Sequence, residues 1–188
     1  AARVPVSTAR PWRRLDLFQS FRATVDAGEL GPPAFFHWVS EEPATGLEED
    51  NPAAVTTAGL DLALWFLADA PDRVFARRTG LGGVTVSLRF RGGANALIER
   101  RGVAPSHARG AGFAWLLGPR GEVRWDERRA GVEMRSDAST SSMISPGCLA
   151  AEVAAAVAGW RDRSAPAPDP AERALVATLA AVNASIQL

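Results

Sequence analysis

The sequence predicts an α+β fold, in which a largely antiparallel open sheet of about six strands carries helices packed on one face. Two observations predict it. Segments rich in β-branched and aromatic residues follow one another through the middle third of the chain, with glycine-rich turns between them. Helical periodicity is confined to the first third and to the C-terminal end. Because strands and helices do not alternate, a doubly wound parallel sheet is not expected.

The first third contains a helix, a strand and a second helix. Apolar residues recur at helical spacing over about 14–27, and Gly28 supplies a stop. The segment 34–39 is aromatic and β-branched, which is typical of a strand. An acidic stretch over 41–50 is expected to be a solvated loop. Leucines on one stripe then predict a helix over 53–68.

The middle of the chain is predicted to form a meander of short strands. Two of its segments, 84–90 and 94–100, flank a Gly-Gly turn and predict an antiparallel hairpin. The polar stretch 136–142 is predicted to be a loop. The strands are predicted at 74–76, 84–90, 94–100, 113–117, 122–125 and 131–135.

Two helices are predicted to finish the chain. The first covers the alanine-rich segment 149–160. The second follows a proline-containing linker, and Asp169, Pro170 and Glu172 provide an N-cap, a first helical residue and a capping-box spacing. The apolar stripe of this helix comprises Leu175, Leu179, Val182 and Ile186.

Composition excludes several chemistries. The chain has no lysine and no tyrosine, so neither a Schiff-base lysine nor a tyrosine acid is available. Twenty-one basic residues balance 21 acidic ones, and no apolar run is long enough to cross a membrane, so neither a nucleic acid nor a membrane is an expected partner. The single Cys148 excludes an internal disulfide and favours a cytoplasmic location. No methionine precedes Met134, which indicates initiator removal or a longer parent chain.

Few residues qualify as chemical groups of a site. His37 lies between Phe36 and Trp38 in a predicted strand, so its side chain is expected on the opposite sheet face from both. It either lines a pocket or is a partly buried strand histidine. His107 is predicted to lie in an exposed loop, and the two histidines have no metal-ligand spacing, so no metal site is expected.

Several strings resemble the C-terminal α/β domain of the Gfo/Idh/MocA oxidoreductases, a dihydrodipicolinate-reductase-like fold. The family has an arginine-containing turn, a Gly-x-Leu-Gly-x-Pro string, an Asp-Leu-x-x-Trp-Leu helix, a Pro-x-x-Val-x-Ala strand and a final Ala-x-x-x-Ser. The matching segments here are Arg10-Pro11, 27–32 (Ala-Gly-Glu-Leu-Gly-Pro), 61–66 (Asp-Leu-Ala-Leu-Trp-Phe), 71–76 (Pro-Asp-Arg-Val-Phe-Ala) and 181–185 (Ala-Val-Asn-Ala-Ser). The similarity extends over essentially the whole chain, with 1–13 as a residual interdomain strand and turn and 14–188 as the substrate and dimerisation domain.

The resemblance implies a domain of an NAD(P)-dependent oxidoreductase that acts on a sugar, an inositol or a related alcohol. It implies a homodimer formed through the open sheet face, and a Rossmann half, or a partner chain, that would carry NAD or NADP and the catalytic lysine. This chain alone is expected to bind no cofactor. The small-molecule substrate is expected beside His37, Trp38, Thr56, Thr57 and Asp61.

One departure from the family pattern concerns catalysis. The family places an aspartate and a histidine seven and three residues before the aspartate of its Asp-Leu-x-x-Trp string. Counting back from Asp61 gives Ala54 and Ala58, neither of which transfers a proton. An alternative hypothesis is therefore a free-standing non-redox homologue that binds a ligand, serves as a structural subunit or catalyses a cofactor-independent reaction.

Overall fold

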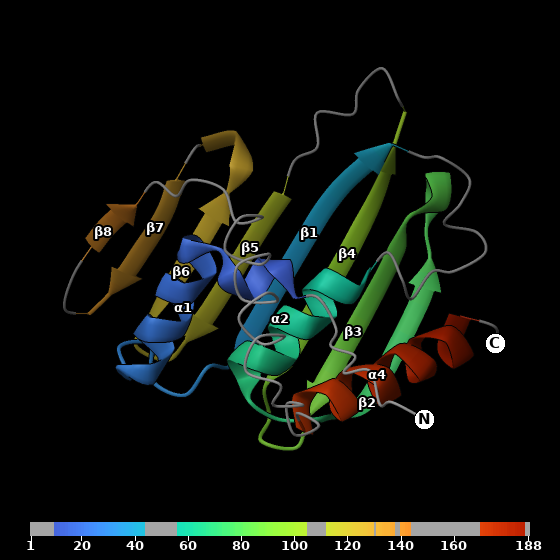
Figure 1. Cartoon of the computed structure of the whole chain (residues 1–188), viewed down its shortest axis with the longest axis horizontal. Coiled ribbons are helices and arrows are strands. Elements are labelled where there is room, and N and C mark those ends of the chain that lie inside the picture. Colours follow the sequence, from blue (N-terminus) through green and yellow to red (C-terminus); the bar gives the residue numbers. More distant parts are fainter. Residues whose placement is uncertain are drawn as a thin grey trace, which may run out of the picture.

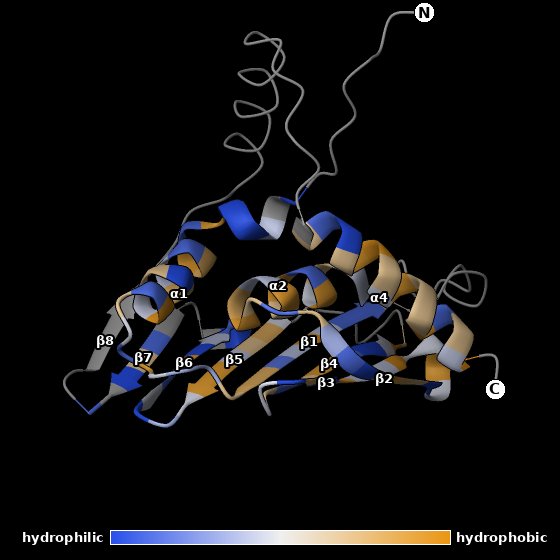
Figure 2. Cartoon of the chain, turned by 90° about the horizontal axis from the view of Figure 1, so that it is seen from below, coloured by the Kyte–Doolittle hydropathy of each residue, from blue (hydrophilic) through white to orange (hydrophobic). Residues whose placement is uncertain are grey.

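The computed structural model describes residues 10–43, 56–104, 112–129, 131–137, 140–143 and 170–186. An eight-stranded sheet carries three α-helices on one face, and the other face is bare of described helices (Figures 1 and 2). The strands are β1 (Phe35–Pro43), β2 (Pro71–Arg78), β3 (Val84–Phe90), β4 (Asn95–Val103), β5 (Gly112–Gly118), β6 (Gly121–Asp126), β7 (Gly131–Ser136) and β8 (Thr140–Met143). The helices are α1 (Asp16–Asp26), α2 (Thr57–Leu67) and α4 (Pro170–Ile186), with short 3-10 turns η1 (Pro11–Arg14), η4 (Gly80–Gly82) and η6 (Glu127–Arg129).

The predicted fold class is confirmed, with more strands than expected. The order across the sheet is β2-β3-β4-β1-β5-β6-β7-β8, and every neighbouring pair is antiparallel except β1 with β4. The expected hairpin of β3 and β4 is present. The loop predicted over 136–142 is wrong in part, because 140–143 pair with β7 as the short strand β8. Polar serines and threonines are compatible with such a short edge strand, which hydropathy patterning does not detect.

The helix predicted over 14–27 corresponds to α1, which follows the 3-10 turn η1, and the last helix begins at Pro170 as predicted. Helix α1 ends just before Gly28, whose φ of 71° is the left-handed conformation that glycine adopts easily. Helix α2 ends at Leu67, and its C-cap residue Ala68 has a φ of 53°. The predicted N-terminal strand, His107, Cys148 and the predicted helix 149–160 lie outside the described residues.

Alternation along the strands decides which side chains enter the core. On β1, Phe36 and Trp38 point to the helices and are 0% and 3% exposed, whereas His37 lies on the bare face. On β4 and β5, Ile98 and Ala114 occupy the same buried layer. Helix α2 is apolar on almost every side because it lies against the sheet and also contacts α4.

The outer edge of β2 is protected by α4. Ala76, in the middle of β2, donates its backbone N–H to Ser185 Oγ at 2.9 Å, and the same hydroxyl lies 3.4 Å from the Ala76 carbonyl oxygen. A serine on the last helix therefore satisfies backbone groups of an edge strand that would otherwise be open to pairing with another chain. Ala76 and Ser185 end two of the strings that carry the family resemblance, and the structure brings them into contact.

Candidate functional site

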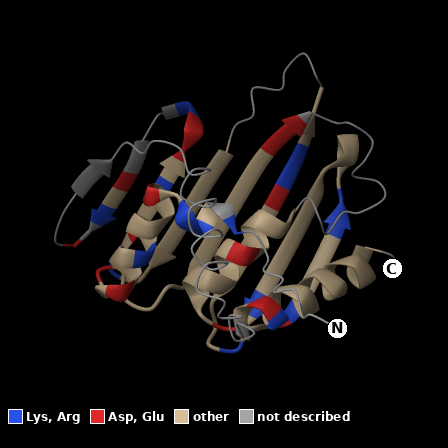
Figure 3. Ribbon diagram, viewed as in Figure 1, with Lys and Arg blue, Asp and Glu red and all other residues tan. Residues whose placement is uncertain are grey.

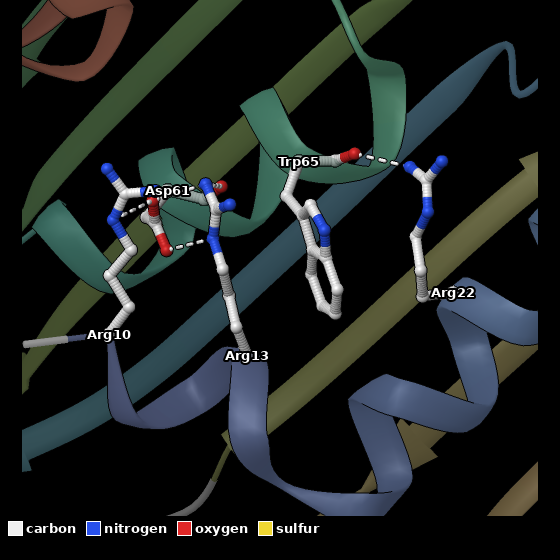
Figure 4. Close-up of polar contacts among 5 residues, drawn as sticks. All are labelled: Arg10, Arg13, Arg22, Asp61 and Trp65. Atoms are coloured by element: carbon white, nitrogen blue, oxygen red, sulfur yellow. Dashed lines mark hydrogen bonds and ion pairs between the residues drawn. The ribbon is translucent and has the colours of Figure 1, made fainter. Parts of the chain in front are cut away.

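A cluster of charged and aromatic side chains joins the N-terminal turn to helix α2 (Figure 4). Asp61 on α2 is 5% exposed. Arg13 binds both of its carboxylate oxygens, with Nε–Oδ2 and Nη2–Oδ1 distances of 2.6 Å each. Arg10 Nε lies 3.6 Å from Oδ1. Two guanidinium groups thus hold one carboxylate, which makes Asp61 a structural anchor for η1 and leaves it poorly placed to accept a proton from a substrate.

The same edge of α2 continues to Trp65. The Arg13 guanidinium carbon lies 5.4 Å from the centre of the Trp65 ring, and Arg22 on α1 donates a 2.7 Å hydrogen bond to the Trp65 carbonyl oxygen. That carbonyl belongs to the last turn of α2, which has no helical donor for it. Beside this edge is a groove of about 580 Å³, lined by Arg13, Arg22, Leu64, Trp65, Ala68, Asp69, Ala70, Ala171 and Ala174.

The other end of α2 carries the predicted threonines. Thr56 is 1% exposed at the N-cap position, Thr57 is half-buried, and Ala58 packs against the core. The described start of this helix therefore carries two hydroxyl groups and a methyl group, of which Thr56 is buried and Thr57 is half-buried. Ala54, the other position of the missing acid–base pair, lies outside the described residues.

Close packing sets the position of α2 on the sheet. A Cβ atom at Gly59 would lie 2.5 Å from Trp38 Cδ1 and 2.6 Å from Ile98 Cγ2, so the helix approaches the sheet at a distance that only glycine permits. Trp38 in turn packs against Trp12 and Trp125, with ring centres 5.1 Å and 5.9 Å away.

We expect Gly59→Ala to lower the free energy of unfolding by about 1–3 kcal/mol, because overpacking outweighs the gain in helix propensity. Gly92→Ala is the matched control, since a Cβ there meets nothing within 4 Å. Urea unfolding measures both variants. Equal stabilities would show that α2 shifts outward at no cost.

His37 lies apart from this cluster. Its Nε2 atom is 3.2 Å from Glu99 Oε2 on β4, and Arg101 binds the same oxygen at 2.8 Å. The sheet separates His37 from Trp38, Thr56, Thr57 and Asp61, so the five predicted site residues do not form one cluster. They divide into four residues on the helix side and one on the bare face.

Burial of Glu99 would raise the pKa of its carboxyl group, but the hydrogen bonds from Arg101 and His37 outweigh burial and hold the pKa below the ordinary value of 4.5. The contribution of Glu99 to stability is therefore complete above pH 4.5 and is lost as the pH falls through the lowered pKa.

We expect Glu99→Gln to flatten the acid side of the profile of melting temperature against pH. The effect should be small because water screens this partly exposed group. Glu29→Gln, whose carboxylate forms no ion pair with a described residue, should leave the slope unchanged. Thermal melts between pH 3 and 7 compare them.

The sequence predicted Asp61 but not the arginines that hold it. The family strings place Arg10 in a turn and Trp65 in a helix, and they assign no role to Arg13 or Arg22. The available signal was a cluster of three arginines, at positions 10, 13 and 14, beside a proline and a tryptophan. Their carboxylate partner lies 48 residues from Arg13 in the chain, so local spacing did not indicate it.

The described part of the chain shows neither a metal-ligand cluster nor a glycine-rich loop that opens an α-helix. Within the described ranges there is no group of three or more His, Cys, Asp or Glu side chains placed to hold a metal ion. The glycine run at 80–83 forms a turn between β2 and β3 and does not open an α-helix, so it lacks the geometry of a pyrophosphate-binding loop. None of the described helices combines the length and the apolar composition that crossing a bilayer requires.

Comparison with solved structures defines the class of fold. The chain superimposes on UDP-N-acetylglucosamine 3-dehydrogenase from Acidithiobacillus ferrooxidans with a TM-score of 0.77 and 15% sequence identity, covering 98% of this chain and 62% of that one. An oxidoreductase from Agrobacterium radiobacter, solved with NAD+, L-tartaric acid and magnesium, gives 0.69 and 17%, covering 97% and 62%. A 3-ketoreductase from Actinomadura kijaniata, solved with NADP, gives 0.67 and 14%, covering 95% and 59%.

These matches confirm the predicted resemblance at the level of the fold. The chain has the fold of the C-terminal domain of Gfo/Idh/MocA-type oxidoreductases and spans about 60% of the length of the structures that it resembles. No protein-family model and no curated protein matches the sequence.

Proposed function

We propose that this chain is the substrate-binding and dimerisation domain of an NAD(P)-dependent oxidoreductase that acts on a sugar, an inositol or a related alcohol. The observation that carries the proposal is the coverage: almost all of this chain matches, but only about 60% of each dehydrogenase or reductase. A Rossmann half, in the same polypeptide or in a partner, would bind NAD or NADP, because the described residues offer no dinucleotide loop.

We assign the substrate to the start of α2, beside Thr56 and Thr57, with Trp38 supporting the helix from below. Hydroxyl groups suit a polyol because each one both donates and accepts a hydrogen bond. Asp61 contributes by anchoring the N-terminal turn, and His37 belongs to the opposite face. In this proposal Ala54 and Ala58 replace the family's acid–base pair, so another group must move the proton during alcohol oxidation.

The alternative, a non-redox homologue, draws on a specific observation. At the described start of α2 the side chains are those of two threonines and Ala58, and the nearby Asp61 carboxylate is held by two arginines. The threonines and Ala58 are not general bases, and both carboxylate oxygens of Asp61 are bound by Arg13. A protein that binds a sugar without oxidising it needs no proton acceptor at this position.

One experiment separates the two functions. The polypeptide that carries this sequence is purified from its natural source, and its mass, NAD(P)H binding and binding of UDP-N-acetylglucosamine and myo-inositol are measured. The oxidoreductase proposal expects a dinucleotide-binding segment and NAD(P)H binding in that polypeptide or in a stable partner. Sugar binding with no response to NAD(P)H, and no such partner, would establish the non-redox alternative instead.

The missing acid–base pair has its own test in the complete enzyme. The double variant Ala54→Asp/Ala58→His should raise kcat for alcohol oxidation by about 100-fold, the lower end of what general acid–base catalysis contributes. Ala54→Asn/Ala58→Gln is the control, because amides of similar size do not transfer protons at neutral pH. Equal rates for the two double variants would show that Ala54 and Ala58 do not occupy the acid–base positions.

We further propose that the bare sheet face forms a homodimer. Its centre is aromatic: Phe35 packs edge-on against Trp115 at 5.8 Å, and His37 contacts Phe113 at 5.6 Å between ring centres. An aromatic patch on a sheet face that no described helix covers is typical of an interaction surface. Sedimentation velocity should detect a dimer that Trp115→Arg dissociates. A monomer at all concentrations would contradict the proposal.

A further inference from the structure

The side chains that face the helices change from apolar to polar toward the C-terminal end of β1. Along β1 and the neighbouring β4, the helix-facing positions that lie under α2 are apolar and buried, as Phe36 and Trp38 are on β1. The next row pairs Ser40 of β1 with Arg100 of β4, and Glu42 follows on the same face of β1. On β1 the apolar core therefore ends at Trp38, and polar side chains follow it.

Helix α2 starts above this polar row. Gly59 lies against Trp38, whereas Phe66, near the other end of the helix, packs on Phe36 with ring centres 5.4 Å apart. The helix therefore runs antiparallel to β1 (Figure 1), and the two threonines that precede Gly59 lie about one turn further toward Ser40. The proposed substrate position beside these threonines thus has the polar end of β1 as its floor.

Glu42 brings a carboxylate to this floor. Its Oε2 atom lies 3.4 Å from Arg100 Nε, and the Arg100 side chain is 1% exposed, so a buried cation orients one carboxylate oxygen. Arg100 also donates a 2.8 Å hydrogen bond from Nη1 to the carbonyl oxygen of Gly82. Figure 3 shows the acidic end of β1 beside the arginines of β4. The Oε1 atom of Glu42 forms no hydrogen bond with a described residue, and the side chain is 51% exposed, so this oxygen is open to a ligand.

Two other carboxylates near this end are placed differently. Both oxygens of Asp61 are bound by an arginine of η1. Glu127 lies on the other side of Ser40, where its Oε2 atom accepts the backbone N–H of Gly112, the β5 partner of Ser40, at 2.7 Å. Helix α2 packs on β1 and β4, so Glu42 shares the strands of the helix, whereas Glu127 lies in η6, beyond β5.

We propose that Glu42 accepts the proton of the alcohol that the complete enzyme oxidises, in place of the acid–base pair lost at Ala54 and Ala58. This inference rests on the proposed oxidoreductase function and adds the base of the same site. A secondary alcohol gives its hydroxyl proton to Glu42 Oε1 and its carbon-bound hydrogen, as hydride, to NAD(P)+, and becomes a ketone; the proton then passes from Glu42 to water. The half-buried Ser40 hydroxyl, which bonds no described residue, binds a second hydroxyl of the polyol.

Glu42→Gln tests this role in the complete polypeptide, with myo-inositol and UDP-N-acetylglucosamine as the probes. We expect kcat for oxidation to fall by at least about 100-fold, because the amide keeps the size of the side chain but accepts no proton. Glu127→Gln is the matched control and should keep the rate of the unchanged enzyme. Added formate should restore part of the lost rate to Glu42→Ala, because it returns a small carboxylate to the vacated space.

Each outcome of these kinetic measurements decides one point. Equal rates for Glu42→Gln and the unchanged enzyme would overturn Glu42 as the base and leave the oxidoreductase function standing. A loss of rate in Glu127→Gln alone would assign the base to the other side of Ser40 and would overturn the proposal in the same way. A complete polypeptide that binds neither sugar nor NAD(P)H would contradict the proposed function itself.

Sugar binding by this chain alone gives a readout that needs no cofactor. Calorimetry with the same two probes should show binding that Ser40→Trp abolishes, because an indole would fill the floor under the start of α2. Glu42→Gln should retain binding, since the amide oxygen still accepts a hydrogen bond. Ser87→Trp, at an exposed position on the opposite face of the sheet, is the control and should leave Kd unchanged.

Circular dichroism and thermal melts verify that these variants are folded. Equal affinities of Ser40→Trp and Ser87→Trp chains would show that the sugar does not lie on the polar end of β1. That result would overturn the assignment of Glu42, whatever the activity of the complete enzyme.

Discussion

Asp61→Asn should lower the free energy of unfolding by about 3–5 kcal/mol, one of the two largest effects expected for a single substitution in this protein. The change removes the negative charge but leaves Arg10 and Arg13, whose side chains are only 15% and 14% exposed. Two nearly buried cations would then face each other without the Asp61 charge between them, and the amide offers only one acceptor oxygen. Thermal unfolding should show a fall in melting temperature of roughly 6–20 °C for a chain of this length.

The control for this prediction is Asp26→Asn. Asp26 pairs with Arg22 at 2.6 Å, the same distance as the Asp61 pair, but its side chain is 58% exposed. Such an exposed pair contributes less than about 1 kcal/mol. The double variant Asp61→Asn/Arg13→Gln should lose less than the sum of its two single changes, because removing one cation relieves the other. A loss for Asp61→Asn as small as that for Asp26→Asn would mean that water reaches the cluster.

Trp38→Ala should destabilise the fold by a similar amount, about 3–5 kcal/mol, through loss of buried aromatic area and creation of a cavity. Trp38 is 3% exposed and lies between Gly59 of α2 and the rings of Trp12, Phe18 and Trp125. Removing the indole leaves α2 without its support on β1. The measurement is urea unfolding at a protein concentration low enough to keep the chain monomeric.

Trp115→Ala is the informative comparison, because Trp115 pairs in register with His37, the neighbour of Trp38, and lies on the bare face. Its truncation should lower monomer stability by only about 1 kcal/mol. The same change should weaken the proposed dimer much more than Trp38→Ala does, when the two variants are compared under conditions in which equal fractions of their chains are folded. Equal losses of monomer stability would contradict the view that one face of the sheet is core and the other is surface.

Local patterns in the sequence predicted much of the architecture. Aromatic and β-branched residues over 34–39 and the leucine stripe of α2 predicted these elements because burial on one face imposes a period of 2.0 on strands and of about 3.6 on helices. The same rule places the side chains of His37 and Trp38 on opposite faces of the sheet. Hydropathy patterning does not predict the polar strand β8, because this strand forms by backbone pairing with β7 and its side chains have no hydrophobic period.

The candidate site was only partly predictable for a related reason. Asp61 stands out as an acidic residue in an apolar helix, but the identity of its partners depends on how η1 crosses α2. No short-range rule links residues separated by 48 positions in the chain. The same holds for Gly59, whose role appears only when Trp38 lies beneath it.

The sequence by itself determined the α+β class, the segregation of helices from strands and the absence of lysine and tyrosine, since these depend on composition and local periodicity. The tertiary structure alone decided that β1 inserts between β4 and β5, that Arg10 and Arg13 neutralise Asp61, and that Ser185 covers the edge of β2. These are contacts between distant segments. Their free energy comes from burial and charge pairing that exist only after the chain has folded.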